Sequence, residues 1–306
     1  MAEHAMYFTD ERAQRMYKIR TVVLKSLVYL FLTLFALFML TPFVVMIIGS
    51  FVEAKAFEKF ESTANFSYLG FANWTVENYS TVFTYGSNSF PTFFLNTFIV
   101  AIGGTTVTVV TAVLAAFAFA RLNFKGKDAL FALLLATMMI PGEMMVITNY
   151  MTVNQINWMN TFAALILVHG VSVFYIFYLR QTFQQIPNEL YLAAKVDGVG
   201  DLGYLVKVMI PIAMPTITTI IILSMMGAWN SFVWPNLVAN GNWKYSDTHS
   251  MKLVSNGLRD MFSAMGARAD SLKIAGSMVI SIPLFIVFIL FRKYIMRGVS
   301  RSGIKG

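Results

Sequence analysis

The sequence contains no cysteine and little charge. Only 12% of its 306 residues are charged, whereas 57% are hydrophobic and the mean hydropathy is +0.65. A typical soluble domain carries about 25% charged residues, so this composition excludes a soluble globular enzyme, a disordered chain and a coiled coil. The absence of cysteine excludes a disulfide framework, a thiolate nucleophile and a cysteine metal site.

Long uncharged stretches alternate with short charged segments along the chain. A helix needs about 20 apolar residues to cross a roughly 30 Å hydrocarbon core, and continuous apolar runs favour helices over the alternating strands of a β-barrel. A polar stretch after position 148 divides the block 129–179 into two spans. The sequence therefore predicts an all-α membrane protein with six transmembrane helices, at 23–50, 91–120, 129–149, 161–180, 209–236 and 274–292.

The basic residues are distributed unequally between the two faces that these spans define. Sixteen of the 23 Lys and Arg residues lie on the face that holds both termini. Because cytoplasmic loops are enriched in Lys and Arg, we expect both termini in the cytoplasm. The net charge of +8 then reflects orientation in the membrane, and it gives no reason to expect a nucleic-acid partner. The first span is too long for a signal-peptide core, so we expect it to remain as an anchor.

The cytoplasmic connection 181–210 differs from the rest of the chain. Pro187 followed by Glu189 is typical of a helix start, and Asp197-Gly198 is typical of a turn. Two short helices around such a turn, held at the membrane face, would form a docking element for a cytoplasmic protein.

The same connection contains a second expected helix and a misleading motif. We expect a short helix over 202–209 that ends before Pro211, because proline disfavours helical geometry in the residue before it. Residues 198–203 match G-x-G-x-x-G, but a dinucleotide fingerprint needs a preceding hydrophobic strand. A polar, helix-like segment precedes it here, so we expect no nucleotide at this position.

This connection resembles the EAA loop of ABC importer permease subunits, whose pattern is close to E-A-A-x-x-D-G-A with an L-P pair further on. The matching residues are Ala193, Ala194, Asp197, Gly198, Ile210 and Pro211. Further matches follow the order found in carbohydrate-type, MalG-like subunits, namely Asn78-Tyr79, Asn96, Ala118–Arg121, Gly126, Met139–Pro141, Phe183, Ile186-Pro187, Trp229-Asn230, Pro235 and Gly303–Gly306. The chain departs from the pattern at Leu192, where the family commonly has a glutamate that pairs with the ATPase. Glu189, one helical turn earlier, is the candidate to replace that glutamate.

The resemblance implies a type I ABC importer permease fold and a transport subunit that is not an enzyme. It implies four kinds of partner in addition to the lipid bilayer: a second homologous permease subunit, two ATP-binding cassette subunits, an extracytoplasmic solute-binding protein and an oligosaccharide. ATP and Mg²⁺ would bind to the ATPase subunits, and we expect no cofactor or metal on this chain, which has no G-x-x-x-x-G-K-[ST] phosphate loop.

The implied function is ATP-driven import of oligosaccharides by alternating access across the bacterial cytoplasmic (inner) membrane. The cargo would be a maltodextrin-like sugar or an acidic oligosaccharide such as alginate. The implied organisation has three parts, which are a cytoplasmic N-terminal segment (1–22), a permease domain (23–296) and a cytoplasmic tail (297–306).

Within the permease domain, the EAA coupling loop covers 183–211, and the outer loops cover about 51–90 and 237–273. Both outer loops are large enough to meet an extracytoplasmic partner, although ordinary interfacial aromatic residues explain them equally well. The resemblance implies an ATPase-coupling role for Glu189, Ala193, Ala194, Asp197, Gly198 and Pro211.

Polar and aromatic residues within the predicted spans are candidates for the substrate pathway. Glu143 is the only carboxylate deep within a span, and an ionisable group at mid-bilayer costs at least about 2.5–3.5 kcal/mol. It either bonds sugar hydroxyls or makes an interhelical hydrogen bond, for which His169 is a possible partner. Asn149, Trp229 and Asn230 are further candidates, because sugar sites combine aromatic faces with amide hydrogen bonds. Trp229 and Asn230 are equally suited to packing.

Two other classes of function fit this composition. A stand-alone secondary carrier or channel would also have several spans and a Glu143–His169 pair, but it gives no reason for a cytoplasmic docking element. A membrane-embedded enzyme needs a cluster of His, Asp or Glu in the bilayer, and these two residues alone are few. Copurification with an ATPase and a binding protein would separate the permease from both alternatives.

Overall fold

The computed structural model describes residues 11–53, 56, 73–265 and 270–300. In these ranges the chain is helical apart from short connections and two isolated β-bridges. Its contacts divide it into two units: unit 1 comprises residues 1–78 with 270–278, and unit 2 comprises residues 79–269 with 279–306. The predicted all-α membrane fold is confirmed. The predictions for 1–10, for 301–306 and for 54–55 and 57–72 of the first outer loop lie outside the described residues.

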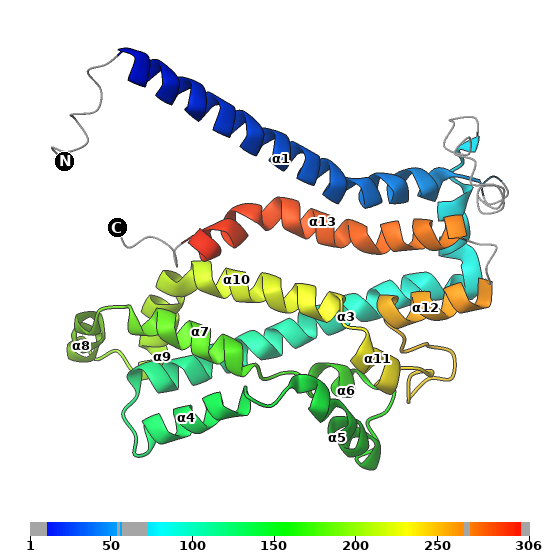
Figure 1. Cartoon of the computed structure of the whole chain (residues 1–306). Helices are drawn as coiled ribbons and strands as arrows, with labels where there is room; N and C mark the ends of the chain where they lie inside the picture. Colours follow the sequence, from blue (N-terminus) through cyan, green and yellow to red (C-terminus); the bar gives the residue numbers. More distant parts are fainter. Residues whose placement is uncertain (1–10, 54–55, 57–72, 266–269, 301–306) are drawn as a thin grey trace. The chain divides into compact units, whose positions relative to one another are not determined.

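The helices differ widely in length. In chain order they are α1 (Glu11–Phe51), α3 (Glu77–Arg121), α4 (Lys127–Thr137), α5 (Gly142–Gln155), α6 (Phe162–Ile166), α7 (Val173–Gln184), α8 (Asn188–Val196), α9 (Asp201–Tyr204), the π-helical segment η3 (Leu205–Met209), α10 (Ile210–Trp229), α11 (Val233–Val238), α12 (Val254–Met265) and α13 (Asp270–Ser300) (Figure 1).

The predicted apolar segments are helical, but three of them are not continuous. The segments 129–149 and 161–180 are each divided into two helices, and 209–236 is interrupted at 230–232 between α10 and α11. Among the described residues, four helical stretches are long and apolar enough to cross a membrane, and they are Arg15–Phe51, Phe90–Arg121, Asp201–Trp229 and Asp270–Arg292. The pair α4 and α5, bent by 93°, brings the number to five if it is counted as one span. The predicted span 161–180 is divided into α6 and α7, and neither piece has the length of a span.

A proline explains the bend between α4 and α5. Pro141 directly precedes α5 with φ −58° and ψ 131°, an extended conformation that ends helical geometry. Proline has no N–H to donate to a preceding turn. The helix is therefore interrupted at the Pro141-Gly142 pair of the predicted span 129–149.

The interruption between α6 and α7 has no proline. The hydroxyl of Thr111 on α3 donates a 2.9 Å hydrogen bond to the carbonyl of Gly170, and the hydroxyl of Ser172 accepts one from the N–H of Tyr175 at 3.4 Å. A Cβ on Gly170 would lie 2.7 Å from a methyl group of Val107. Because Gly170 has no side chain, the non-helical backbone can approach α3 closely enough for the carbonyl of Gly170 to accept the hydrogen bond from Thr111.

The expected helix end before Pro211 is wrong. Pro211 lies in the first turn of α10, where its missing N–H costs no intrahelical hydrogen bond. The π-helical segment η3 precedes it, and together α9, η3 and α10 form one continuous helical stretch, Asp201–Trp229. The coupling loop is thus connected to the next span without a break in the helix.

In unit 1, a buried asparagine closes the end of α1. The side-chain amide of Asn78 donates to the carbonyls of Ser50 and Val52 at 3.0 and 2.8 Å. The rings of Phe51 and Trp74 stack with their centroids 5.7 Å apart. The chain therefore returns to α1 after the residues that lie outside the described ranges.

In unit 2, α8 and α9 lie at one end and α11 and α12 at the other (Figure 1). At the α12 end, the amide of Asn96 on α3 donates to the carbonyls of Ser250 and Lys252 at 2.7 and 3.1 Å. The hydroxyl of Thr97 accepts from the N–H of Val254 at 2.9 Å. Because backbone groups in a non-helical segment need partners, these two polar residues hold residues 250–254 against α3.

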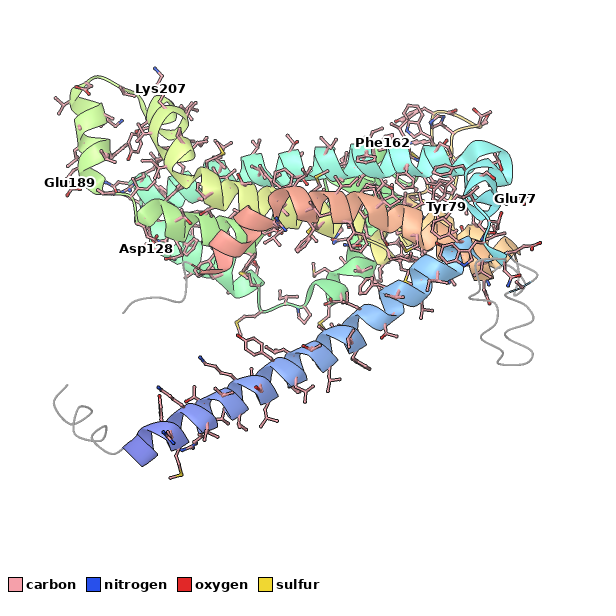
Figure 2. All side chains as sticks on the ribbon, turned by 90° about the horizontal axis from the view of Figure 1, so that it is seen from above. Glu77, Tyr79, Asp128, Phe162, Glu189 and Lys207 are labelled. Carbon is pink, nitrogen blue, oxygen red and sulfur yellow. The ribbon has the colours of Figure 1, made fainter. Side chains whose placement is uncertain are left out.

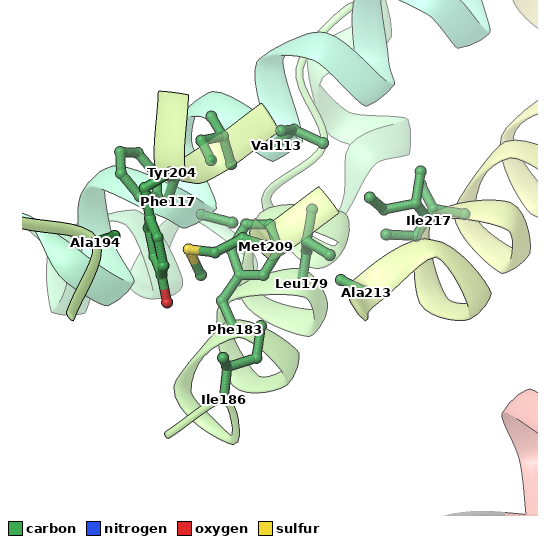
Figure 3. Packing of buried hydrophobic residues seen from close by; sticks show 13 residues of the cluster. Val113, Phe117, Leu179, Phe183, Ile186, Ala194, Tyr204, Met209, Ala213 and Ile217 are labelled. Atoms are coloured by element: carbon green, nitrogen blue, oxygen red, sulfur yellow. The ribbon is translucent and has the colours of Figure 1, made fainter. Parts of the chain in front are cut away.

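At the α8 end, a compact apolar cluster joins α3, α7, α8, α9 and α10. Its largest fully buried side chains include Tyr204, Phe183, Leu179 and Met209 (Figure 3). Ala194 of the coupling loop belongs to the same cluster. The coupling loop is therefore packed onto α3, α7 and α10, which makes it part of the core of unit 2.

We predict opposite effects for alanine at two helical glycines. A Cβ on Gly257 of α12 would lie 2.4 Å from the buried ring of Phe93, so Gly257→Ala should destabilise the protein by about 1–3 kcal/mol through overpacking. No atom lies within 4 Å of a Cβ on Gly104 of α3, so Gly104→Ala should be neutral or slightly stabilising. Thermal unfolding in detergent measures both variants, and equal unfolding temperatures would contradict the packing described for α12.

Candidate functional site

The residues predicted to couple to an ATPase lie at one end of unit 2, where Glu189, Ala193 and Asp197 are exposed and Ala194 is buried. Glu189 on α8 and Lys207 on η3 lie at that end, whereas Tyr79 lies at the opposite end (Figure 2). Asp128, at the start of α4, lies on the same side as Glu189 (Figure 2). Charged residues of α4, α8 and η3 therefore lie toward the same end of unit 2 (Figure 2).

One face of α8 is exposed and the other is packed. Glu189, Ala193 and Asp197 are exposed, and so are the apolar side chains of Leu192 and Val196, at 56% and 87%. Residues three or four apart share a helix face, so these five residues form one continuous surface, which we call the α8 face. It presents two apolar side chains between two carboxylates.

The turn after α8 is formed by the Asp197-Gly198 pair that the sequence predicted. Gly198 has φ +75°, a left-handed conformation that glycine adopts without steric cost. The N–H of Gly198 donates to the carbonyl of Lys195 at 3.1 Å, and the N–H of Val199 donates to that of Ala194 at 2.8 Å. These bonds satisfy carbonyls at the end of α8 and direct the chain back into α9.

A polar cluster links α8 to α9 across this turn. The ammonium of Lys195 lies 2.6 Å from Oδ1 of Asp201, and the hydroxyl of Tyr191 donates to the same oxygen at 2.7 Å. The hydrogen bond with Asp201 raises the pKa of Lys195 above its ordinary value. A raised pKa means that the ammonium, and with it the ion pair, is lost only as the pH rises past that value. The cluster therefore persists at neutral pH.

Arg121 fastens the coupling loop to the end of α3. Its guanidinium donates to the carbonyl of Phe183 at 2.9 Å and to the carbonyl of Ile186, and it reaches Oδ1 of Asn188 at 3.4 Å. The sequence pattern matched Arg121 and Ile186 to the family separately, but it did not predict the hydrogen bond between them. The partners are backbone carbonyls, which leave no pattern in the sequence.

The four candidate pathway residues are not brought together by any contact in the described part of the chain. Glu143 is exposed in the first turn of α5. No hydrogen bond joins it to His169 among the described residues, and the ring of His169 instead meets Trp234 edge to face, with centroids 5.2 Å apart. Asn149 is half-buried further along α5.

Trp229 is buried at the end of α10, and Asn230 directly follows this helix. The indole N–H of Trp229 donates to the carbonyl of Ile280 at 3.2 Å, and its ring meets Phe94 and Phe98 edge to face. Asn230 is exposed, and its amide donates to the carbonyl of Met226 in its own helix. A pathway role for either residue stays a prediction.

The described residues contain no group of three His, Asp or Glu side chains that could hold a metal ion. The site offers the exposed carboxylates and apolar side chains of the α8 face at one end of unit 2.

We predict that Arg121→Ala loosens the junction between α7 and α8. Losing the guanidinium leaves the carbonyls of Phe183 and Ile186 without their donor, so deuterium uptake over residues 184–196 should rise severalfold in hydrogen-exchange mass spectrometry. Lys125→Ala removes a neighbouring exposed basic residue and serves as the control. Equal exchange in both variants would contradict a fastening role for Arg121.

Known transport proteins are similar to this chain. It is 30% identical over 232 residues to the arabinooligosaccharides transport system permease protein AraQ of Halalkalibacterium halodurans, which covers 76% of this chain and 80% of that protein. It is 28% identical over 289 residues to the polygalacturonan/rhamnogalacturonan transport system permease protein YtcP of Bacillus subtilis, which covers 92% and 97%.

A solved structure has the same fold. The crystal structure of a bacterial ABC transporter involved in the import of the acidic polysaccharide alginate contains a chain that matches with a TM-score of 0.72 at 22% identity, over 93% of this chain and 98% of that one. The family model described as binding-protein-dependent transport system inner membrane component matches residues 13–302. Because this match covers nearly the whole chain, the chain belongs to the family of binding-protein-dependent transport system inner membrane components.

Proposed function

We propose that this chain is a permease subunit of an ATP-driven importer that moves oligosaccharides into the cytoplasm by alternating access. The α8 face carries this proposal, because an exposed helix face held by Arg121 and by the Lys195–Asp201 pair suits the transfer of force from another protein. The docking partner would be one of two ATP-binding cassette subunits, which hold the ATP and Mg²⁺.

The names of similar permeases support an oligosaccharide as the cargo. Those names include neutral sugars, such as the arabinooligosaccharides of AraQ, and acidic ones, such as the polygalacturonan of YtcP. A structural neighbour was solved as an alginate ABC transporter in complex with an alginate-bound periplasmic protein. By analogy, a solute-binding protein delivers the sugar here, and a second homologous permease subunit completes the pathway.

The α8 face defines how this subunit would contact its ATPase. Leu192 occupies the position of the family's usual glutamate and is 56% exposed, and Glu189 lies three residues earlier on the same exposed face. A carboxylate is thus still presented to the ATPase, displaced by one helical turn and beside an apolar side chain. We infer that the contact combines an ion pair through Glu189 with apolar packing on Leu192 and Val196.

Nothing in the described residues favours the stand-alone carrier. A Glu143–His169 pair would have fitted that alternative, but no hydrogen bond between the two is found among the described residues, where His169 contacts Trp234. The rigid coupling loop also has no purpose in a carrier that works alone.

Reconstitution tests the proposed function. The complete complex, assembled from the cognate permease, ATPase and binding-protein subunits in proteoliposomes, should hydrolyse ATP faster when the binding protein is loaded with oligosaccharide, and should accumulate that sugar. Transport by this chain alone, driven by a proton gradient, would overturn the proposal.

We predict that Gly198→Val uncouples ATP hydrolysis from uptake. Valine is strained at φ +75°, so the turn should shift and displace the α8 face, and sugar uptake per ATP hydrolysed should fall at least severalfold. Gly200→Ala is the matched control, because Gly200 has φ −68° and a Cβ added to it would have no atom within 4 Å. Normal coupling in the Gly198 variant would contradict the role given to the turn.

A further inference from the structure

A hollow of about 260 Å³ lies within unit 2 among α3, α6, α7, α10 and α11. Gly104 lines it from near the middle of the apolar stretch Phe90–Arg121, and Ser224 lines it from the half of α10 that is further from the coupling loop. The hollow therefore belongs to the membrane-embedded part of the chain, and it is separate from the α8 face.

The wall of this hollow includes the interrupted span. Leu165 and Ile166 at the end of α6, His169 in the interruption, and Ser172 and Tyr175 at the start of α7 all line it. Non-helical backbone at membrane depth is tolerated only where it is buried in protein or lines a water-filled cavity. The interruption thus places polar side chains at a depth where a continuous apolar helix would place none.

Several of these polar side chains are available to a ligand. His169, Tyr175, Ser224 and Ser231 line the hollow, and their side chains make no hydrogen bond to another residue in the described part of the chain. Together they offer hydroxyl groups and ring nitrogens that donate and accept. A ligand with many hydroxyl groups matches this set, because each of its groups can also do both.

The remaining wall supplies an aromatic and apolar surface. The indole N–H of Trp234 donates to the carbonyl of Ala164 at 3.0 Å, which fixes the buried ring beside the hollow. Leu223 and Leu253 add apolar surface. The volume is slightly below the roughly 300–1,000 Å³ typical of ligand pockets, so the hollow suits a single ring better than a long chain.

Charge decides between the two classes of sugar. No Asp, Glu, Lys or Arg of the described residues lines the hollow, so a carboxylate that entered it would be desolvated without a fixed cation to pair with, which is costly. We propose that the hollow binds one neutral sugar unit of the transported oligosaccharide, as a substrate subsite on this chain. This inference rests on the proposed function and narrows its substrate class to neutral oligosaccharides.

The experiment fills the hollow in the complete reconstituted complex. A Cβ added to Gly227, which lines the hollow, would have no atom within 4 Å, so Gly227→Leu introduces a side chain without a backbone clash. Uptake of neutral oligosaccharides, with arabinooligosaccharides and maltodextrins as probes, should fall at least tenfold. Basal ATP hydrolysis and the affinity of the binding protein for the sugar should not change.

Matched variants separate the subsite from general effects. Thr106→Leu adds leucine to an exposed position of α3 that does not line the hollow, where the hydroxyl bonds only within its own helix, and it should transport normally. Tyr175→Phe and Ser224→Ala each remove one hydroxyl and should each raise the KM for uptake about two- to tenfold, the range for one neutral hydrogen bond. If the Gly227→Leu subunit does not assemble into the complex, these two variants still test the subsite.

The outcomes distinguish the inference from the proposed function. If the wild-type complex imports neutral sugars and Gly227→Leu imports them equally well, the subsite is overturned and the function stands. If the wild-type complex imports oligogalacturonides but no neutral sugar, the subsite alone is overturned. The same holds if Gly227→Leu displaces a copurifying lipid from the hollow while sugar uptake is unchanged. If the wild-type complex imports no sugar at all, both proposals fail.

Discussion

The need to satisfy every backbone polar group in the absence of water constrains this chain more than any other factor. In hydrocarbon an unpaired N–H or C=O costs several kcal/mol, so an interrupted helix needs substitute partners. Between α6 and α7 these partners are Thr111 for the carbonyl of Gly170 and Ser172 for the N–H of Tyr175. At the other interruption, Pro141 has no N–H that needs a partner. Both interruptions are therefore tolerated, and the first one brings polar side chains to the wall of the hollow.

The composition and the apolar runs were enough to predict a helical membrane protein, and the asparagines that divide the third and fourth spans were informative. Asn157 and Asn160 both have positive φ, which asparagine tolerates better than most residues. The interruption at Gly170 could not be predicted, because 161–180 contains no proline and its stability depends on Thr111, 59 residues away. The helix end predicted before Pro211 was wrong because a proline can end a preceding helix but is also suited to the first turn of the next one. For the coupling loop, the resemblance implied a role for Glu189, Ala193 and Asp197, which are exposed, and also for Ala194, which is buried. The contacts of Arg121 were missed because its main partners are carbonyls.

The two candidate sites use opposite physical means. The coupling loop is held by charge, through the Lys195–Asp201 pair and Arg121, because it lies where water can solvate the remaining polar groups. The described wall of the hollow contains no fixed charge and offers hydroxyl groups, one imidazole and an indole face. Charged pairs suit a surface that has to remain rigid while a partner moves it, and neutral hydrogen-bonding groups suit a passage that has to release what it binds. The apolar cluster around Tyr204 and Phe183 lies next to the coupling loop and joins it to the long helices.

The second half of α3 is anchored at two points, one near the middle of the helix and one at its end, and this has a mechanical consequence. Asn96 and Thr97 bind the backbone of residues 250–254, and Arg121 binds the backbone at 183 and 186. At 1.5 Å per residue, the helix between Thr97 and Arg121 sets a separation of about 36 Å between these two attachment points. A helix of this kind keeps its length under load, so the two attached segments can tilt together but cannot approach or separate. This half of α3 thus acts as a rod of fixed length, so a displacement of the coupling loop along the axis of α3 would be accompanied by a displacement of the 250–254 segment.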